Sequence, residues 1–184
     1  MGGSLKYEEL LEFYKKYPAF KSVSNFVETG TYKGDTSLMA AEHFDKVFTM
    51  EIVEDLYRGS MERAAREGVT NVSFHLGDSL EVLPKILPQV EDGAVFFIDA
   101  HQSGPDTGNN QKHLVPLFEE LDLILSHDLG PSVFIFDDVR FWEGQRQPAW
   151  DWAHISVKKI LDKFEGLFVI DSFVSNDRFF VLTG

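Results

Sequence analysis

The sequence lacks or has few of several residue types and patterns, and each of these absences excludes a class of functions. It has 184 residues and no cysteine, which excludes disulfides, thiolate catalysis and metal sites held by cysteine. Basic residues are scarce, because 17 Lys and Arg stand against 30 Asp and Glu, for a formal net charge of −13. This imbalance argues against nucleic acid and against an anionic membrane as partners, since cationic side chains dominate binding to both.

Long apolar runs are also missing from the chain. No run approaches the roughly 20 residues that are needed to cross a bilayer, and the N-terminus is polar. Hydrophobic residues nevertheless make up 43% of the chain and include 17 phenylalanines, which is enough for a sizeable core. We therefore expect one soluble, cytoplasmic domain that spans residues 1–184.

Short apolar runs alternate with amphipathic segments along the chain. Strands are predicted at 26–28, 46–51, 72–76, 94–98, 132–136, 167–173 and 178–182. Helices are predicted at 36–44, 53–67, 79–87, 114–125 and 155–164. This alternation predicts a doubly wound α/β fold with a mostly parallel sheet. The last two strands, joined by a short turn, predict a C-terminal antiparallel hairpin.

Two stretches without periodicity, 102–110 and 140–152, each follow a strand that ends in aspartate. Loops at the carboxyl ends of parallel strands carry the ligand sites of such folds. The first stretch is interpreted as a gate at 104–110 or as an ordinary exposed loop. The second contains Phe141, Trp142, Trp150 and Trp152 beside two arginines, Arg140 and Arg146. It predicts a substrate wall, with a loop packed on the core or a homodimer interface as alternatives.

A glycine-rich loop follows the first predicted strand and opens the first predicted helix. Its residues Glu28, Gly30 and Gly34 have the spacing Glu-x-Gly-x-x-x-Gly. Glycines let the backbone turn sharply and approach a ligand, and a helix N-terminus presents free N–H groups to anionic oxygens. The spacing differs from the dinucleotide-binding and P-loop patterns. Alone, the loop is also consistent with a tight strand–helix turn.

Polar residues also end the next two predicted strands. Glu51 follows Gly30 by about 20 residues, the spacing at which a carboxylate accepts both hydroxyls of a ribose. Asp78 and Ser79 follow the third strand and are placed to hydrogen-bond a base, although either would also serve as a helix N-cap. Together with the glycine loop, these residues describe a nucleoside site across consecutive strand ends.

Three aspartates form a second group of candidate residues. Asp99 ends one apolar strand, and Asp137 and Asp138 end another. If these strands are neighbours, three carboxylates meet in one crevice, which is costly unless one is protonated or a cation is bound. Mg²⁺ prefers carboxylates and water, so a magnesium site is predicted. The alternatives are helix caps, or a metal-free site that uses Asp99 alone.

With these residues in this order, the chain resembles the class I S-adenosylmethionine-dependent methyltransferases from about residue 27 to residue 139. It is most similar to the metal-dependent O-methyltransferases of the catechol and macrolide-sugar types. The glycine loop would hold the methionine part of the cofactor, Glu51 the ribose, and Asp78 with Ser79 the adenine. The implied cofactor-binding residues are Glu28, Gly30, Tyr32, Gly34, Thr36, Ser37, Glu51, Asp78, Ser79 and Asp99.

The expected reaction is methyl transfer to the oxygen of a small hydroxylated molecule such as a vicinal diol, catechol or sugar. Mg²⁺ held by Asp99, Asp137 and Asp138 would bind the substrate oxygens. His101, two residues after Asp99, is the candidate general base, and Asp99 is the second candidate catalytic residue. Catechol-type enzymes usually have a lysine near this point and an asparagine as the last ligand, so the sequence departs from them here.

Two other functions stay open. The chain has only about 20 residues before its first predicted strand, where such enzymes often carry helices that cover the acceptor. A non-catalytic or degenerate nucleoside-binding module is therefore one alternative. A metal-free methyltransferase of another acceptor class is the second; among such acceptors, nucleic acid is disfavoured by the net charge of −13.

Overall fold

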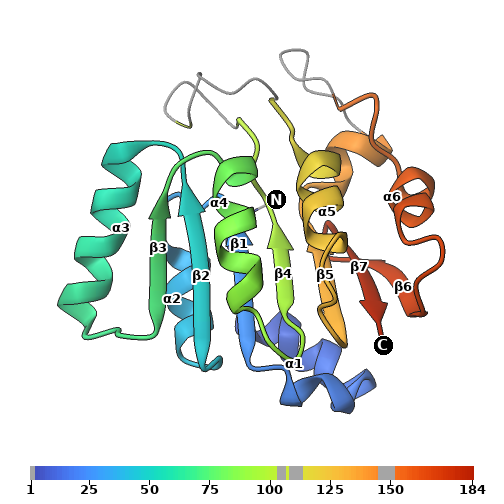
Figure 1. Ribbon diagram of the computed structural model, residues 1–184, viewed down its shortest axis with the longest axis horizontal. Helices are drawn as coiled ribbons and strands as arrows, with labels where there is room; N and C mark the ends of the chain where they lie inside the picture. The colour runs from blue at the N-terminus through green and yellow to red at the C-terminus, as the bar shows by residue number, and fades with distance from the viewer. Residues whose placement is uncertain (1–2, 103–106, 108–113, 145–151) are drawn as a thin grey trace.

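The computed structural model describes residues 3–102, 107, 114–144 and 152–184, which form a seven-stranded sheet flanked by helices (Figure 1). The strands are β1 (Asn25–Thr29), β2 (Lys46–Glu51), β3 (Val72–Leu76), β4 (Val95–Ile98), β5 (Ser132–Phe136), β6 (Val169–Ser175) and β7 (Arg178–Thr183). Their order across the sheet is β3-β2-β1-β4-β5-β7-β6. Within the described ranges, no helix is long and apolar enough to pass through a bilayer.

Helices cover both faces of the sheet. They are α1 (Tyr7–Lys16), α2 (Asp35–Ala41), α3 (Glu54–Glu67), α4 (Ser79–Ile86), α5 (Leu117–Leu125) and α6 (Val157–Lys163). Short 3-10 turns lie at η1 (Pro18–Ser22) and η2 (Leu87–Gln89), and a π-helical turn lies at η3 (Arg140–Gly144). Buried side chains of α4, α5 and α6 join one hydrophobic cluster, and those of α1 and α2 join a second.

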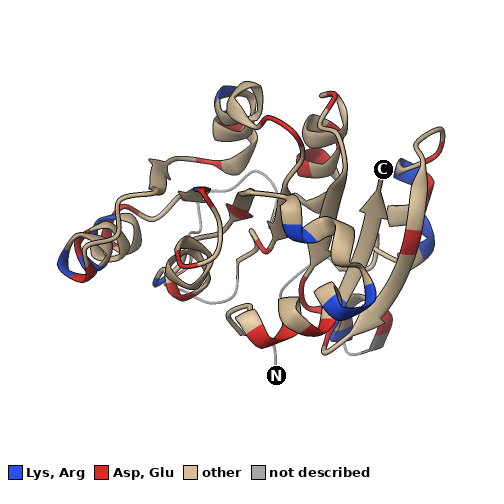
Figure 2. Ribbon diagram, turned by 90° about the horizontal axis from the view of Figure 1, so that it is seen from below, with Lys and Arg blue, Asp and Glu red and all other residues tan. Residues whose placement is uncertain are grey.

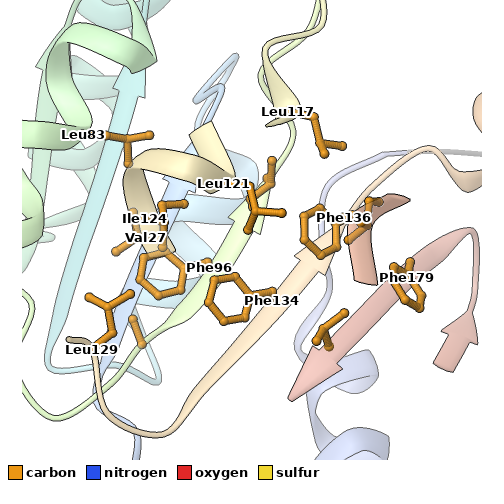
Figure 3. Packing of buried hydrophobic residues seen from close by; sticks show 14 of the residues in the cluster. Val27, Leu83, Phe96, Leu117, Leu121, Ile124, Leu129, Phe134, Phe136 and Phe179 are labelled. Atoms are coloured by element: carbon orange, nitrogen blue, oxygen red, sulfur yellow. The ribbon is translucent and has the colours of Figure 1, made fainter. Parts of the chain in front are cut away.

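The two central strands, β4 and β5, supply side chains to both clusters. Phe96 and Phe134 stack with ring centroids 5.1 Å apart in the first cluster, which Figure 3 shows from close by. Phe97 and Ile135 point to the other face and join the second cluster. Every residue of these two strands is at most 4% exposed. Their continuously apolar sequences therefore reflect burial on both faces of the sheet, as predicted.

The predicted fold class is confirmed. Strands β1 to β5 pair in parallel, and β7 runs antiparallel to both β5 and β6. The hairpin between β6 and β7 turns through Asn176 and Asp177, which both have positive φ, at 50° and 68°. Asn and Asp tolerate this left-handed conformation better than other residues that carry a Cβ.

Two local predictions need correction. The helix predicted at 114–125 begins at Leu117, because Pro116 occupies the N-cap and disfavours helical backbone in the residue before it. Helix α1 was not predicted at all, although Leu10, Phe13 and Tyr14 are buried on one side of it. Glu9 accepts a hydrogen bond from the Lys6 amide and so caps its first turn. This spacing and cap were visible in the sequence.

The five parallel strands end along one edge of the sheet, where their crossover connections begin. The residues after them are the glycine loop, Ile52, Gly77, Asp99 and Asp137. The backbone of this edge is continuous, since the Asp99 amide donates to the carbonyl of Thr29 and the Asp137 amide to that of Ile98. The predicted site residues therefore lie side by side in space, although they span most of the chain.

Candidate functional site

The loop after β1 lies closer to β4 than a side chain would allow. Gly30 has a φ of +89°, and a Cβ atom there would stand 2.9 Å from the carbonyl oxygen of Asp99. The amides of Gly30 and Thr31 donate to the carbonyl of Met50 at 3.1 and 3.0 Å. The loop is thus fixed between β2 and β4, and glycine leaves its backbone open to a ligand.

Glu28 lies beneath this loop with its side chain in the protein interior. Its Oε2 accepts hydrogen bonds from Thr49 Oγ1 at 2.7 Å and from the hydroxyl of Ser37. Burial raises the pKa of Glu28 to about 8, although these hydroxyls oppose the change. Ser37 is fully buried and directed at Glu28, so it supports the loop from below. Thr36 accepts a hydrogen bond from the Leu5 amide at 3.1 Å.

Glu51 joins the end of β2 to the glycine loop. Its two carboxylate oxygens accept hydrogen bonds from the amides of Tyr32 and Val53, each at 2.8 Å. Burial raises the pKa of Glu51, and the backbone amides counteract this. The Ile52 amide also acts on this carboxylate, and since its two oxygens have about four lone-pair sites, at least one is left for a further donor. Glu51 is therefore both a structural tie for the loop and an acceptor for ligand hydroxyls.

Asp78 and Ser79, in the turn after β3, have different roles. Asp78 caps α4, because its Oδ1 accepts a hydrogen bond from the Leu80 amide at 2.9 Å. This is the helix-capping alternative considered from the sequence. Ser79 lies at the first position of α4 and faces the crevice between the strand ends.

These elements enclose a crevice of about 210 Å³. Of the predicted cofactor residues, those that line it are Glu28, Gly30, Tyr32, Thr36, Glu51, Ser79 and Asp99. Gly34, Ser37 and Asp78 do not line it; Ser37 donates to the Glu28 side chain, and Asp78 caps α4. Sequence reasoning missed Gly3 and Ser4, which enter the crevice from the N-terminal segment. Nothing in their residue types marks them, and only the fold brings them there.

His101 lies at the far end of the same crevice, between two carboxylates. Its Nδ1 is 3.4 Å from Asp99 Oδ1, and its Nε2 is 3.0 Å from Asp138 Oδ2. Burial lowers the pKa of the imidazole, but the two carboxylates outweigh it and raise the pKa to about 10. His101 is therefore held as a cation at neutral pH, which differs from the neutral imidazole that a general base requires. Burial raises the pKa of Asp99, and His101 opposes this.

Asp138 is held by cations on both sides. It adopts a φ of +62°, directs Oδ2 to His101 and places Oδ1 2.5 Å from Arg140 Nη2. Burial disfavours its charge, yet His101 and Arg140 together keep the pKa of Asp138 below its usual value. Asp177, in the β6–β7 turn, accepts a hydrogen bond from the Arg140 amide at 2.8 Å and pairs with the Arg140 guanidinium.

Asp137 is buried beside an arginine. Its Oδ1 lies 3.4 Å from Nε of Arg178, which is only 5% exposed. Burial and the charge of Asp99 raise the pKa of Asp137 to about 8 in spite of Arg178. Arg178 also donates to Glu9 Oε1 at 2.6 Å and to the Gly3 carbonyl at 2.5 Å. It thereby joins the N-terminal segment to the end of β5.

The three predicted metal ligands are divided between two groups. The first group is Asp99, His101 and Asp138, and the second is Asp137, Asp138 and Asp177. Within each group, the ligand atoms all lie within 4.8 Å of one another. In the first group both imidazole nitrogens face carboxylates, so the histidine itself supplies positive charge. A histidine that binds a metal must be neutral. Neither group within the described residues contains all three of Asp99, Asp137 and Asp138, and a magnesium ion at this place stays a prediction.

The aromatic stretch after β5 packs inward. Trp142 and Trp152 are 7% and 3% exposed and belong to the first hydrophobic cluster. Trp142 Nε1 donates to the carbonyl of Asp137 at 3.2 Å, and the Trp152 ring meets His101 edge-on at 5.1 Å. The alternative of a loop packed on the core is thus correct for these two residues. The homodimer, which depended on exposed aromatics, stays a prediction.

Several predicted features lie outside the described residues. They are Arg146, Trp150 and the candidate gate at 104–110, except for Thr107, which lines the crevice.

Similarity to known proteins covers a short segment in sequence and nearly the whole chain in structure. No protein-family model matches the chain. Over 60 residues, or 33% of the chain, it is 35% identical to the human protein tRNA (uracil-5-)-methyltransferase homolog B, and the match spans 12% of that protein.

Solved structures resemble nearly the whole chain. One is the O-methyltransferase TomG from Streptomyces achromogenes, in complex with SAM, which has a TM-score of 0.59 at 18% identity. The alignment covers 94% of this chain and 78% of TomG. A SAM-dependent methyltransferase from Aquifex aeolicus has a TM-score of 0.56 at 13% identity and covers 92% of this chain and 87% of its own. The chain therefore has the fold of the class I S-adenosylmethionine-dependent methyltransferases.

Proposed function

We propose that this chain is an S-adenosylmethionine-dependent methyltransferase that methylates a hydroxyl oxygen of a small molecule. One observation carries the proposal. One end of a crevice is lined by Glu51 and Ser79, which lie at the ends of β2 and β3, and the other end by Asp99 and His101, which follow β4; the glycine loop after β1 lies between them. A nucleoside at the first end places its attached group beside an acid–base pair at the second.

The residues at the first end fit the cofactor. A Cβ atom at Gly30 would stand 2.9 Å from the Asp99 carbonyl oxygen, so glycine lets the loop lie against the end of β4, and Gly30 itself lines the crevice. Glu51 offers carboxylate lone pairs to the two ribose hydroxyls, and its position is fixed by Tyr32 and Val53. Ser79 offers one hydroxyl to the base. These roles follow from the geometry and from the resemblance stated above.

When bound, the cofactor would supply a methyl group on a sulfonium, whose carbon can bond to an acceptor oxygen as the C–S bond breaks and its electrons go to sulfur. The protein must then hold the acceptor hydroxyl against this group and accept its proton. Because His101 is already protonated, we assign proton acceptance to Asp99 and assign His101 to orienting Asp99 and Asp138. This exchanges the roles expected from the sequence.

A divalent cation takes no part in this chemistry as proposed. His101 and Arg140 neutralise Asp138, and Arg178 stands beside Asp137, so positive charge is already present at each position. We therefore expect methyl transfer to persist in excess EDTA. Activity that requires added Mg²⁺ would contradict this and restore the role predicted for Asp99, Asp137 and Asp138.

The test is formation of S-adenosylhomocysteine from S-adenosylmethionine with catechol and simple sugars as probe acceptors. Replacing Asp99 by Asn should lower turnover by about 10²- to 10⁴-fold, the usual contribution of a positioned base. Cofactor affinity should change much less, which calorimetry can check. Cofactor binding without turnover on any hydroxylated probe would favour the non-catalytic alternative.

RNA is a second candidate acceptor, because the chain matches a tRNA methyltransferase homolog over 60 residues. The net charge of −13 argues against it, and Figure 2 shows Lys and Arg on separate parts of the ribbon with Asp and Glu among them. We expect no salt-sensitive binding to a tRNA transcript in a filter assay. Tight binding that weakens steeply with salt would replace the small-molecule acceptor by RNA.

A further inference from the structure

Arg63, on helix α3, contacts the glycine loop from outside the crevice. Its Nη1 donates to the Lys33 carbonyl at 3.3 Å and also to the Asp35 carboxylate. Its Nε donates to Glu67, one turn further along α3, at 3.0 Å, which fixes the direction of the guanidinium plane. Arg63 therefore bridges the residues on either side of Gly34. It does not line the crevice itself, but Lys33 and Asp35 both do.

We propose that Arg63 is a positioning residue for the amino-acid part of the bound cofactor, and that it acts through the loop segment from Lys33 to Asp35. The inference rests on the proposed function, because it concerns the cofactor site of the same crevice. It assigns to a residue of α3, which does not touch the ligand, the task of holding the two charged side chains that face it.

The loop packs on α3 with no room for a side chain at Gly34. Gly34 has a φ of +79°, and a Cβ atom there would stand 3.0 Å from Ser60 Cβ. Ser60 is 1% exposed, and its hydroxyl donates to the carbonyls of Leu56 and Tyr57, each at 3.0 Å. Ser60 therefore offers the loop a packing surface, since its hydrogen is used within α3. Arg63, one turn beyond Ser60 on the same side of the helix, supplies the polar contacts.

The segment that connects β2 to α3 holds the loop at a second place. Glu51 ends β2, and α3 begins at Glu54. The carboxylate of Glu51 accepts hydrogen bonds from the amides of Tyr32 and Val53, each at 2.8 Å. Tyr32 directly precedes the part of the loop that Arg63 contacts. Because Glu51 is also the proposed ribose acceptor, one strand–helix unit sets the position of the loop relative to the ribose.

The charges of this segment indicate which part of the cofactor it faces. Lys33 and Asp35 line the crevice and carry opposite charges. Lys33 Nζ lies 5.2 Å from the centroid of the Tyr32 ring, and Asp35 is paired with Arg63. The ammonium and carboxylate of the amino-acid part are charged, whereas the base and the ribose are not. A shift of Lys33 and Asp35 should therefore change the binding of the amino-acid part and leave the nucleoside nearly unaffected.

The experiment is calorimetric titration of the full chain with S-adenosylhomocysteine and with 5′-methylthioadenosine, which has the nucleoside but no amino-acid part. Arg63→Met removes both loop contacts and should weaken S-adenosylhomocysteine binding about fivefold, the size expected for a partly exposed charged contact, and 5′-methylthioadenosine binding by less than about twofold. Arg63→Lys keeps the charge without the planar guanidinium and should lie between the wild type and Arg63→Met.

Arg58→Met is the matched control. Arg58 lies on the same helix and pairs with Glu54 at its surface, so this variant should bind both ligands as the wild type does. Circular dichroism checks that each variant is folded.

The outcomes separate the two proposals. If the wild type binds neither ligand, the proposed function fails and this inference fails with it. If the wild type binds both ligands and a folded Arg63→Met binds S-adenosylhomocysteine equally tightly, the inference alone is overturned. Equal losses for the two ligands overturn it as well, because the variant then disturbs the nucleoside site. A loss for S-adenosylhomocysteine that 5′-methylthioadenosine does not share, partly restored in Arg63→Lys, supports it.

Discussion

Two buried carboxyl groups, Glu28 at the cofactor end of the crevice and Asp138 near the catalytic end, have pKa values that are shifted in opposite directions. At the cofactor end, Glu28 is surrounded by hydroxyls, and burial raises its pKa to about 8. At the catalytic end, Asp138 is 5% exposed and nearly as buried, yet its pKa lies below its usual value. The difference is the pair of cations, His101 and Arg140, that contact Asp138.

Burial therefore does not set the charge of these acids by itself. A hydroxyl can stabilise either protonation state, whereas an imidazolium or guanidinium stabilises the carboxylate. Glu28 is accordingly neutral near pH 7, and Asp138 is ionised. Asp137 lies between these cases, because Arg178 stands 3.4 Å away and burial still raises its pKa to about 8.

Removing a buried cation should have the largest effect on stability. Arg178→Met leaves Glu9 and Asp137 without their cation, which should lower the free energy of unfolding by about 3–5 kcal/mol. Urea denaturation measures this loss. Arg58→Met is the matched control, since Arg58 pairs with Glu54 on the surface and should cost at most about 0.5 kcal/mol. Equal losses in the two variants would show that burial of the pair does not matter.

The neutral acids should make stability depend on pH. Glu28 has its pKa raised from 4.5 to about 8, so between these values the folded chain binds more protons than the unfolded chain. Its contribution to stability is complete below pH 4.5 and is lost as the pH rises through about 8.

Glu28→Gln should remove this dependence, at up to about 1.4 kcal/mol per pH unit within the window. Urea midpoints at pH 5.5, 6.5 and 7.5 measure the slope, with Glu81→Gln as the exposed control. A variant whose slope equals that of the wild type would mean that Glu28 is ionised in the folded protein, and the contrast between the two ends would disappear.

The smallest effect on stability is expected for the partly exposed pair of Asp177 and Arg140. Asp177→Asn keeps an oxygen for the Arg140 amide but loses the charge beside the guanidinium, which is 33% exposed. We expect a loss of about 1 kcal/mol in stability, less than for a fully buried pair. Thermal unfolding measures it, and a loss as large as that of Arg178→Met would contradict the ranking.

The residues at the strand ends could be predicted from the sequence, but the side chains that they contact could not. Alternating apolar runs identified the sheet, and Glu51, Ser79 and Asp99 could be placed because each follows a strand. Arg178 could not be paired with Glu9 from the sequence, because 169 residues separate them and only the fold brings them together. The split between Asp137 and Asp138 depends on a positive φ of 62° at Asp138, a conformation that residue type alone does not specify.

The measurement that tests the central claim most directly is calorimetric titration of the purified chain with S-adenosylhomocysteine. The account predicts saturable binding of one molecule per chain, with no added metal. It also predicts at least about tenfold weaker binding for Glu51→Ala, which loses the ribose acceptor. Absence of binding by the folded wild type, with or without Mg²⁺, would contradict the account.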